Sequence, residues 1–297
     1  MIVDNEQALT AAVLGVMQRT SDPRLREIMA ALIRHLHGFV REIRLTEAEL
    51  REAAALIAEL GQCTTDSHNE VMLMAGSLGV SSLVCLLNNG NDGATETSQN
   101  LLGPFWRLHS PRVENGGSIV QAPTPGPAIF VTFTVVDRAR RPVSGAEIDI
   151  WHSTPAGQYD NQDPSLAGMN LRGKFTTGAD GRIAFRSVKP AGYPIPADGV
   201  VGRLLAAQIR HPYRPAHIHA LVFKSGYKTL TSQVYADDDP NLETDVQFGV
   251  TRALVGRFER HDAPHPTAPD VAPPWYTLSH IFVLEPGEAR LPRPPIK

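Results

Sequence analysis

The spacing of apolar side chains changes its period once along this chain of 297 residues. In residues 24–43 the apolar positions recur at the spacing that places them on one face of an α-helix. They are Leu25, Ile28, Met29, Leu32, Ile33, Leu36, Val40 and Ile43. Thr46 followed by Glu49 matches a capping box and predicts a second helix, which Gly61 ends. Residues 66–88 predict two more short helices, broken near Gly79.

From residue 128 onward the period becomes two, which is the period of β-strands. We expect strands over residues 129–136, 146–151, 181–186, 218–223, 229–235 and 278–284. Short strands with proline-rich connections are typical of an antiparallel sandwich. Residues 155–175 and 190–215 are expected to be long loops, which in compact domains often carry function. The sequence therefore predicts an α+β protein with a helical region over residues 1–100 and an antiparallel β-sandwich over residues 101–297.

Composition narrows the class of protein without adding a function. Hydrophobic residues make up 42% of the chain and charged residues 20%, which is ordinary for a globular protein, and a net charge of −3 gives no reason to expect nucleic-acid binding. No apolar stretch is long enough to span a membrane, and the N-terminus lacks the pattern of a secretory signal. Cys63 and Cys85 are expected to be free thiols in a reducing compartment, so we predict a cytoplasmic protein.

Candidate chemistry is concentrated in a histidine pair within an apolar strand. His217 and His219 are two residues apart, so both imidazoles lie on one face of the strand and can reach one metal ion. An apolar strand has no packing use for two adjacent imidazoles, because each needs a hydrogen-bond partner when buried. Tyr159 and Tyr193 lie upstream in turns rich in glycine and proline. Taken singly, each tyrosine can equally be a loop aromatic that covers a sheet edge, so it is the joint occurrence that indicates a site.

The local phrases around these residues resemble one enzyme family. In the order found in intradiol ring-cleavage dioxygenases, the chain carries WHSTPAGQY at 151–159, KPAGYPIP at 189–196, RPAHIH at 214–219 and TSQ at 231–233. The match spans most of residues 100–285. Members of this family are non-heme iron(III) enzymes that cleave catechols between the two hydroxyls. The phrase YPIPADGVVG at 193–202 is similar to the hydroxyquinol branch in particular.

The resemblance implies a metal site with four protein ligands. Tyr159 and His217 would be the equatorial ligands of one iron(III) ion per chain, and Tyr193 and His219 would be the axial ligands. Ferric iron is a hard cation that favours anionic oxygen donors, and imidazole also suits iron. The residue types at these four positions therefore fit the metal that the family uses.

The resemblance also implies catalytic roles for three residues. Arg214 and Gln233 would face the substrate, although taken alone Arg214 can be a surface ion-pair partner and Gln233 an ordinary strand residue. Arg214 cannot lose its proton and would stabilise negative charge that develops on the ring. Tyr193 would act as a general base as well as a ligand.

The implied reaction uses O2 to open hydroxyquinol (benzene-1,2,4-triol) to maleylacetate. Two alternatives stay open. The chain could instead be a catechol or chlorocatechol 1,2-dioxygenase, which yields cis,cis-muconates, or a metal-binding sandwich without catalysis, and a colourless zinc protein would indicate the latter. The resemblance further implies a homodimer formed through the N-terminal helices, where family members often hold a phospholipid.

A substrate pocket follows from the same resemblance. Its expected wall comprises Leu73, Gly76, Leu101, Pro104, Phe105, Ile195 and Val246. The hydroxyquinol branch usually carries an aspartate at the position of Gly76, where a carboxylate can accept a hydrogen bond from the third hydroxyl. A glycine leaves room there, so we expect tolerance of a bulky ring substituent and weak selectivity for hydroxyquinol over catechols. Gly76→Asp is expected to shift selectivity toward hydroxyquinol.

Overall fold

The computed structural model describes residues 3–66, 68–88, 96–162 and 168–295. By its internal contacts the chain divides into two compact units, Met1–Glu59 and Leu60–Lys297. The functional division near residue 100 rests on the change in sequence pattern, and it stays a prediction.

The first unit is helical. It contains α1 (Glu6–Met17), α2 (Pro23–Ile43) and most of α3 (Glu47–Gln62), and α1 contacts α2. Side chains cap the helix starts: Asp22 Oδ1 accepts hydrogen bonds from the backbone N–H groups of Arg24 and Leu25. The capping box is confirmed, since Glu49 N donates to Thr46 Oγ1 at 3.3 Å and Thr46 N donates to Glu49 Oε2 at 2.8 Å. Helix α1 was not predicted, because its apolar residues are not confined to one face.

The second unit begins with two short helices that match the prediction. Helices α4 (Glu70–Ser77) and α5 (Val80–Leu87) are separated at Gly79, whose φ of 73° ends the helical run in a conformation that suits glycine. No single helix among the described residues is both long and apolar enough to cross a membrane, and α4 and α5 reach that standard only as a pair bent by 73°.

A third helix of the second unit lies where we expected a loop. Helix α6 (Val200–Ala207) falls within residues 190–215, so that expectation is wrong for this segment. Its N-cap is Gly199, which has no side chain to cap the helix. The buried carboxylate of Glu70 on α4 instead accepts a hydrogen bond from Val201 N at 2.8 Å. The local sequence does not show this start signal because another helix supplies it.

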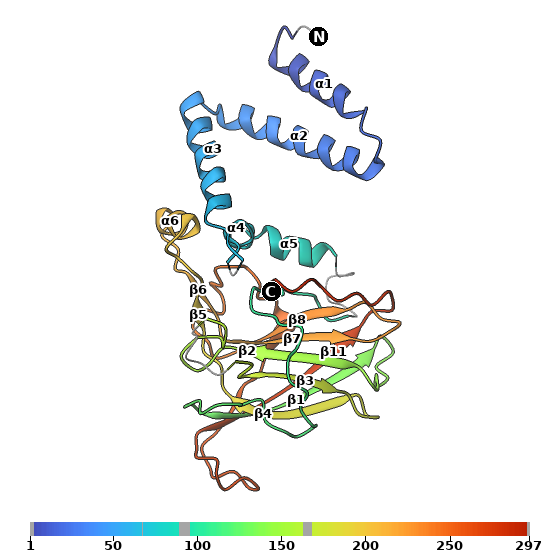
Figure 1. The fold of residues 1–297 in the computed structure, drawn as a ribbon, viewed down its shortest axis with the longest axis vertical. Helices are drawn as coiled ribbons and strands as arrows, with labels where there is room; N and C mark the ends of the chain where they lie inside the picture. Colours follow the sequence, from blue (N-terminus) through green and yellow to red (C-terminus); the bar gives the residue numbers. More distant parts are fainter. Residues whose placement is uncertain (1–2, 67, 89–95, 163–167, 296–297) are drawn as a thin grey trace. The chain divides into compact units, whose positions relative to one another are not determined.

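Two large sheets and a two-stranded sheet, β5 (Tyr193–Pro194) with β6 (Tyr213–Arg214), complete the regular structure of the second unit, and the large sheets lie in two layers (Figure 1). One has the order β10 (Glu259–His261), β11 (Trp275–Leu284), β1 (Ala128–Asp137), β4 (Arg182–Val188). The other has the order β3 (Arg172–Thr176), β2 (Glu147–His152), β7 (His217–Phe223), β8 (Leu230–Ala236), β9 (Val255–Gly256). Alternate residues of both sheets share one core: Val131 and Phe133 of β1, for example, belong with Ile148 and Ile150 of β2. The predicted sandwich is therefore confirmed.

The sequence predicts purely antiparallel sheets, but both large sheets contain a parallel pair of strands and are therefore mixed. Strand β1 runs parallel to β11 from Ile129 opposite Tyr276 to Asp137 opposite Leu284, and β8 runs parallel to β9. A tight hairpin turn imposes antiparallel pairing, but β1 and β11 are far apart in the sequence and no such turn joins them. The short strands β3, β9 and β10 were not predicted, because they lack an alternating apolar pattern of useful length.

Candidate metal centre and active site

Strand β7 carries both histidines on one side of the sheet, as their spacing predicts. His217 lies opposite Tyr235 of β8, and His219 lies between Trp151 of β2 and Gln233 of β8. The two Nε2 atoms are 3.1 Å apart, and both rings are almost completely buried. The indole of Trp151 stacks on the His219 ring with a centroid separation of 4.5 Å and an angle of 8°, which holds that imidazole in one plane.

The two tyrosines complete a compact cluster with the histidines. Tyr193 Oη lies 3.5 Å from His217 Nε2 and 3.5 Å from Tyr159 Oη. Tyr159 follows β2 in a loop, as predicted. Tyr193 instead belongs to the two-residue strand β5 (Tyr193–Pro194), where it pairs with Arg214 of β6 (Tyr213–Arg214). The structure thus brings all four predicted ligand side chains together, and their binding of a metal stays a prediction.

The protonation state of the histidines suits metal binding. His217 Nδ1 lies 2.7 Å from the carbonyl oxygen of Pro215, which can only accept, so Nδ1 carries the proton and Nε2 presents a lone pair to the cluster. Burial lowers the pKa of His217 to about 3, and burial together with His217 holds the pKa of His219 well below its usual range. Both imidazoles are therefore neutral at neutral pH, which is the form that binds metals.

The tyrosines are held in the neutral form unless a cation is present. Burial raises the pKa of Tyr159 well above its usual range, and the neighbouring Tyr193 adds to the effect. Burial also raises the pKa of Tyr193, while the nearby Arg214 guanidinium opposes the rise. A bound cation inverts this balance because it favours the phenolate. The cluster of two neutral imidazoles and two ionisable phenols thus fits a hard trivalent metal.

A metal ion bound at this cluster would need tyrosine among its ligands. Among the residues that the structure describes, no group of three or more His, Cys, Asp or Glu side chains is arranged to hold a metal ion. Nδ1 of His219 and Nε1 of Trp151 also lack hydrogen-bond partners within the described part of the chain, although both atoms are buried. Two buried nitrogens at the cluster thus have no hydrogen-bond partner among the described residues, which is unusual where side chains serve packing alone.

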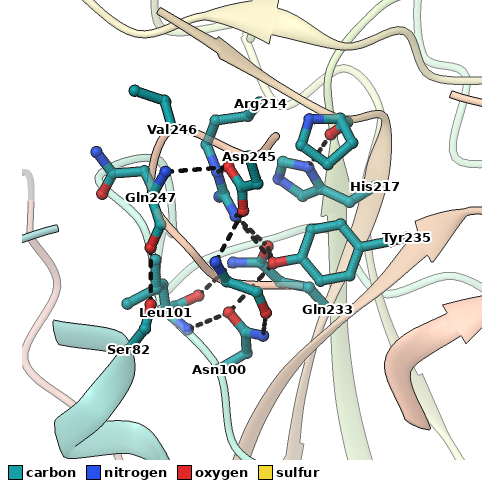
Figure 2. Close-up of polar contacts among 12 residues, drawn as sticks. Ser82, Asn100, Leu101, Arg214, His217, Gln233, Tyr235, Asp245, Val246 and Gln247 are labelled. Carbon is teal, nitrogen blue, oxygen red and sulfur yellow. Dashed lines mark hydrogen bonds and ion pairs between the residues drawn. The ribbon is translucent and has the colours of Figure 1, made fainter. Parts of the chain in front are cut away.

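Arg214 is held in a buried network beside the cluster (Figure 2). Its Nε and Nη2 atoms each lie 3.1 Å from a carboxylate oxygen of Asp245, and Nη2 also donates to Gln233 Oε1 at 3.1 Å and to Tyr235 Oη at 2.8 Å. Burial disfavours the charged guanidinium, but Asp245, Tyr235 and Tyr193 together raise the pKa of Arg214 well above its usual range. The pKa of Asp245 is lowered, since Arg214 likewise overcomes the effect of burial there. A fixed positive charge thus lies next to Tyr193.

The predicted pocket residues fall into two groups. Leu73, Ile195 and Val246 share an apolar cluster with residues of α6. Near the metal cluster, Phe105 stacks on Tyr159 with a centroid separation of 4.2 Å, and the Leu101 carbonyl accepts a hydrogen bond from Gln233 Nε2 at 2.6 Å.

The segment that carries Leu101 and Phe105 passes close to His219. Gly103 has a φ of 73°, and a β-carbon there would lie 3.3 Å from the His219 ring. A glycine is therefore required for this approach. Pro104, the remaining residue of the predicted wall on this segment, is exposed in a turn.

The expected vacancy at Gly76 is not present. A β-carbon built on Gly76 would overlap Gln247 Oε1 and lie 2.7 Å from Gln247 Cδ, so the carboxamide of Gln247 fills the space that we expected to be open. Protein interiors are densely packed, and a position without a side chain is usually filled by a neighbour. Room for a bulky substituent at residue 76 is therefore wrong, and Gly76→Asp alone would clash with Gln247.

Two further groups at the site were missed in the sequence. Asp245 anchors Arg214, and Asp160 anchors the loop that carries Tyr159 by accepting from Arg172 Nε at 2.7 Å and Nη2 at 2.5 Å. Arg172 Nη1 also donates to the Phe105 carbonyl at 2.6 Å, so it connects the two segments that stack in the site. Asp160 directly follows a predicted ligand, which is a usable signal. Asp245 has no such signal, because it lies 31 residues from its partner.

The buried carboxyl of Asp149 should make the stability of the second unit depend on pH. Its side chain is buried with Oδ2 3.3 Å from Trp106 Nε1 and 3.4 Å from Lys174 Nζ, while Oδ1 has no partner among the described residues. Burial raises the pKa of Asp149 to about 6. In the unfolded chain the carboxyl titrates near its ordinary value of about 3.9. Below about pH 4 the carboxyl is protonated in both states, so it does not change the free energy of unfolding. As the pH rises from about 4 to 6, ionisation increasingly favours the unfolded state, and above about pH 6 this destabilisation is complete.

Asp149→Asn should remove this cost. We expect the variant to be more stable than the original protein at pH 8, by about 2–3 kcal/mol, and to show no such gain at pH 4. Denaturant unfolding at the two pH values measures both differences. An equal difference at pH 4 and pH 8 would show that the Asp149 carboxyl is not titrating as described.

Known proteins resemble this chain over most of its length. Residues 103–273 match a protein-family model described as "Dioxygenase", and residues 22–96 match one described as "Catechol dioxygenase N terminus". The chain is 40% identical to a hydroxyquinol 1,2-dioxygenase of Rhizobium sp. (strain MTP-10005), over 94% of this chain and 95% of the relative. It is 39% identical to a hydroxyquinol 1,2-dioxygenase of Nocardioides simplex, over 95% and 96%. The solved structure of hydroxyquinol 1,2-dioxygenase from Pseudomonas putida DLL-E4 superposes with a TM-score of 0.87 at 34% identity, covering 95% of this chain and 99% of that one.

Proposed function

Because the chain belongs to the intradiol ring-cleavage dioxygenase family, we propose that it is an iron(III) enzyme that cleaves hydroxyquinol with O2 to give maleylacetate. One observation carries the proposal: two phenol oxygens and two imidazole Nε2 atoms converge with successive separations of 3.5, 3.5 and 3.1 Å. The hydroxyquinol 1,2-dioxygenases that match almost the whole chain support this choice of substrate.

Tyr159, Tyr193, His217 and His219 would hold one iron ion per chain. The two phenolates would offset part of the ionic charge, and the two neutral imidazoles would donate through Nε2. When bound, iron(III) would supply a Lewis acid that favours the ionised form of the substrate's ortho hydroxyls.

Tyr193 would accept a substrate proton. Its Oη is the member of the cluster that contacts both Tyr159 and His217, and the Arg214 guanidinium lies across the β5–β6 pair from it. A phenolate at Tyr193 can take up a hydroxyl proton at Oη and remain buried as the neutral phenol, which is the form that burial favours.

Arg214 would stabilise negative charge on the ring while O2 reacts. Two of its three nitrogens are bound to Asp245, and Gln233 and Tyr235 hold Nη2, so the guanidinium cannot reorient freely. A preorganised charge in a buried site stabilises developing charge without the cost of rearrangement. Phe105 stacked on Tyr159 would keep water from that side of the cluster.

We also propose that the protein is a cytoplasmic homodimer that pairs through its N-terminal helices and holds phospholipid there. Helix α2 supports this, because it leaves a series of large apolar side chains exposed: Leu25, Ile28, Leu32, Leu36, Phe39, Val40 and Ile43. Such a face is normally covered by another apolar surface. Cys63 and Cys85 are not joined in a disulfide, which agrees with a reducing compartment.

A substrate panel tests the proposed function. Hydroxyquinol, catechol and chlorocatechol are supplied separately to the iron-loaded protein with O2, and each product is identified by mass spectrometry. We expect maleylacetate from hydroxyquinol with the highest kcat/KM of the three. Selective formation of cis,cis-muconates from catechols would assign the substrate to the catechol type instead. A protein that binds stoichiometric zinc and cleaves none of them would be a metal-binding module without this activity.

A further inference from the structure

We infer that Gln247 is a substrate-specificity residue, and that its carboxamide accepts a hydrogen bond from the ring hydroxyl that distinguishes a benzenetriol from a catechol. This inference rests on the proposed function. It begins from the contact at Gly76, where the Gln247 side chain occupies the volume that a side chain on α4 would otherwise fill.

The amide nitrogen of the Gln247 carboxamide is hydrogen-bonded, whereas its oxygen has no donor among the described residues. Gln247 Nε2 donates to Ser77 Oγ at 3.2 Å, and the residue as a whole is only 7% exposed. No donor in the described parts of the chain bonds Oε1, and this oxygen is not completely buried. An acceptor that is neither bonded nor sealed off can receive a hydrogen bond from a small ligand.

The turn that carries Gln247 is rigidly fixed (Figure 2). Asp245 Oδ1 accepts from Gln247 N at 3.2 Å, and Asp245 Oδ2 accepts from Gly249 N at 2.9 Å. Ser82 Oγ donates to the Gln247 carbonyl at 2.8 Å, which ties the turn to α5. The side chain therefore starts from a backbone with little freedom, as a specificity contact requires.

The same carboxylate connects this turn to the catalytic guanidinium. Asp245 binds Arg214 through both of its oxygens while it holds the backbone of Gln247. Between them, Val246 shares an apolar cluster with Ile195, which lies two residues beyond the predicted ligand Tyr193. One carboxylate thus holds both the Arg214 guanidinium and the backbone N–H of Gln247.

The chemistry of the acceptor indicates which substrates benefit. A neutral carboxamide oxygen accepts from a neutral phenol hydroxyl, and a ring that lacks this hydroxyl would leave Oε1 desolvated without a partner. A site that pairs a hydroxyl selects strongly against analogues without it, whereas apolar contacts select weakly. Gln247 thereby provides from the 245–249 turn the acceptor that residue 76 cannot provide as glycine.

The test compares hydroxyquinol with catechol in Gln247→Leu, which keeps the size of the side chain and removes the acceptor. We expect the ratio of kcat/KM for hydroxyquinol to that for catechol to fall about tenfold, with the same direction in the ratio of anaerobic dissociation constants measured by calorimetry. Gly76→Asp combined with Gln247→Ala removes the clash and places a carboxylate nearby, so it should restore the preference for hydroxyquinol. Gln121→Leu, an exposed glutamine before β1, is the matched control and should leave the ratio unchanged.

The outcomes separate this inference from the proposed function. If the original protein cleaves hydroxyquinol and Gln247→Leu leaves both ratios unchanged, Gln247 does not contact the substrate hydroxyl and the inference is overturned, while the proposed function stands. If the original protein prefers catechol, the proposed substrate fails first. A lower ratio in Gln247→Leu that the double variant restores supports the inference, and it also excludes a general loss of folding as the cause.

Discussion

His219→Ala is expected to abolish iron binding and ring cleavage together. His219 Nε2 lies 3.1 Å from His217 Nε2, and it contributes one of only four donor atoms in the cluster. Removing one ligand leaves an open, under-coordinated site whose metal affinity collapses, and the buried phenols then revert to the neutral form that their surroundings favour. The red-brown colour of a tyrosinate–iron(III) centre should disappear with the metal.

Metal content per chain and the visible absorption spectrum measure this result. His280→Ala is the matched control, because His280 is a partly buried histidine of β11 in the other sheet whose ring contacts those of Phe133 and Phe282. It should keep both iron and colour. If His219→Ala retains stoichiometric iron and its absorption band, the histidine pair is not part of the metal site.

Arg214→Ala is expected to lower kcat by about a hundredfold or more while iron stays bound. The guanidinium is a buried positive charge next to the cluster, and it is not itself a ligand donor. Arg214→Lys should also be strongly impaired, because a single ammonium group cannot bond Asp245, Gln233 and Tyr235 in the planar arrangement of the guanidinium.

The measurement for Arg214 is kcat per bound iron. Arg186→Ala provides the comparison. Arg186 belongs to β4 in the other sheet and pairs with the exposed Asp270, so this substitution should leave turnover intact. A purely structural arginine at position 214 would reduce the folded fraction without changing the turnover of each iron-loaded molecule. An unchanged kcat per iron in Arg214→Ala would therefore exclude the catalytic role.

The part of the site that the sequence predicts well depends on local periodicity. His217 and His219 face the same side because strands have a period of two, and this holds wherever the strand lies in the sheet. The side chains of the four predicted ligands also lie close together, as the family resemblance implied. The predicted strands follow for the same reason, and the four predicted helices follow from apolar residues at helical spacing, the capping box and the break at Gly79.

The rest depends on contacts between residues that are distant in the sequence. Gln247 fills the space beside Gly76, and Asp245 neutralises Arg214, although neither pair lies in one local pattern. The parallel pairing of β1 with β11 is likewise set by packing of the sandwich and not by a turn. A glycine predicts that a side chain is missing at its own position, but it does not predict which neighbour enters the space.

The fate of molecular oxygen tests the central proposal most directly. Hydroxyquinol is supplied to the iron-loaded protein under ¹⁸O₂, and the product is analysed by mass spectrometry. An intradiol dioxygenase that works at the tyrosine–histidine cluster should form maleylacetate that carries both labelled oxygen atoms. A product with only one labelled atom, a ring opened outside the two ortho hydroxyls, or no uptake of oxygen by the iron-loaded protein would contradict it.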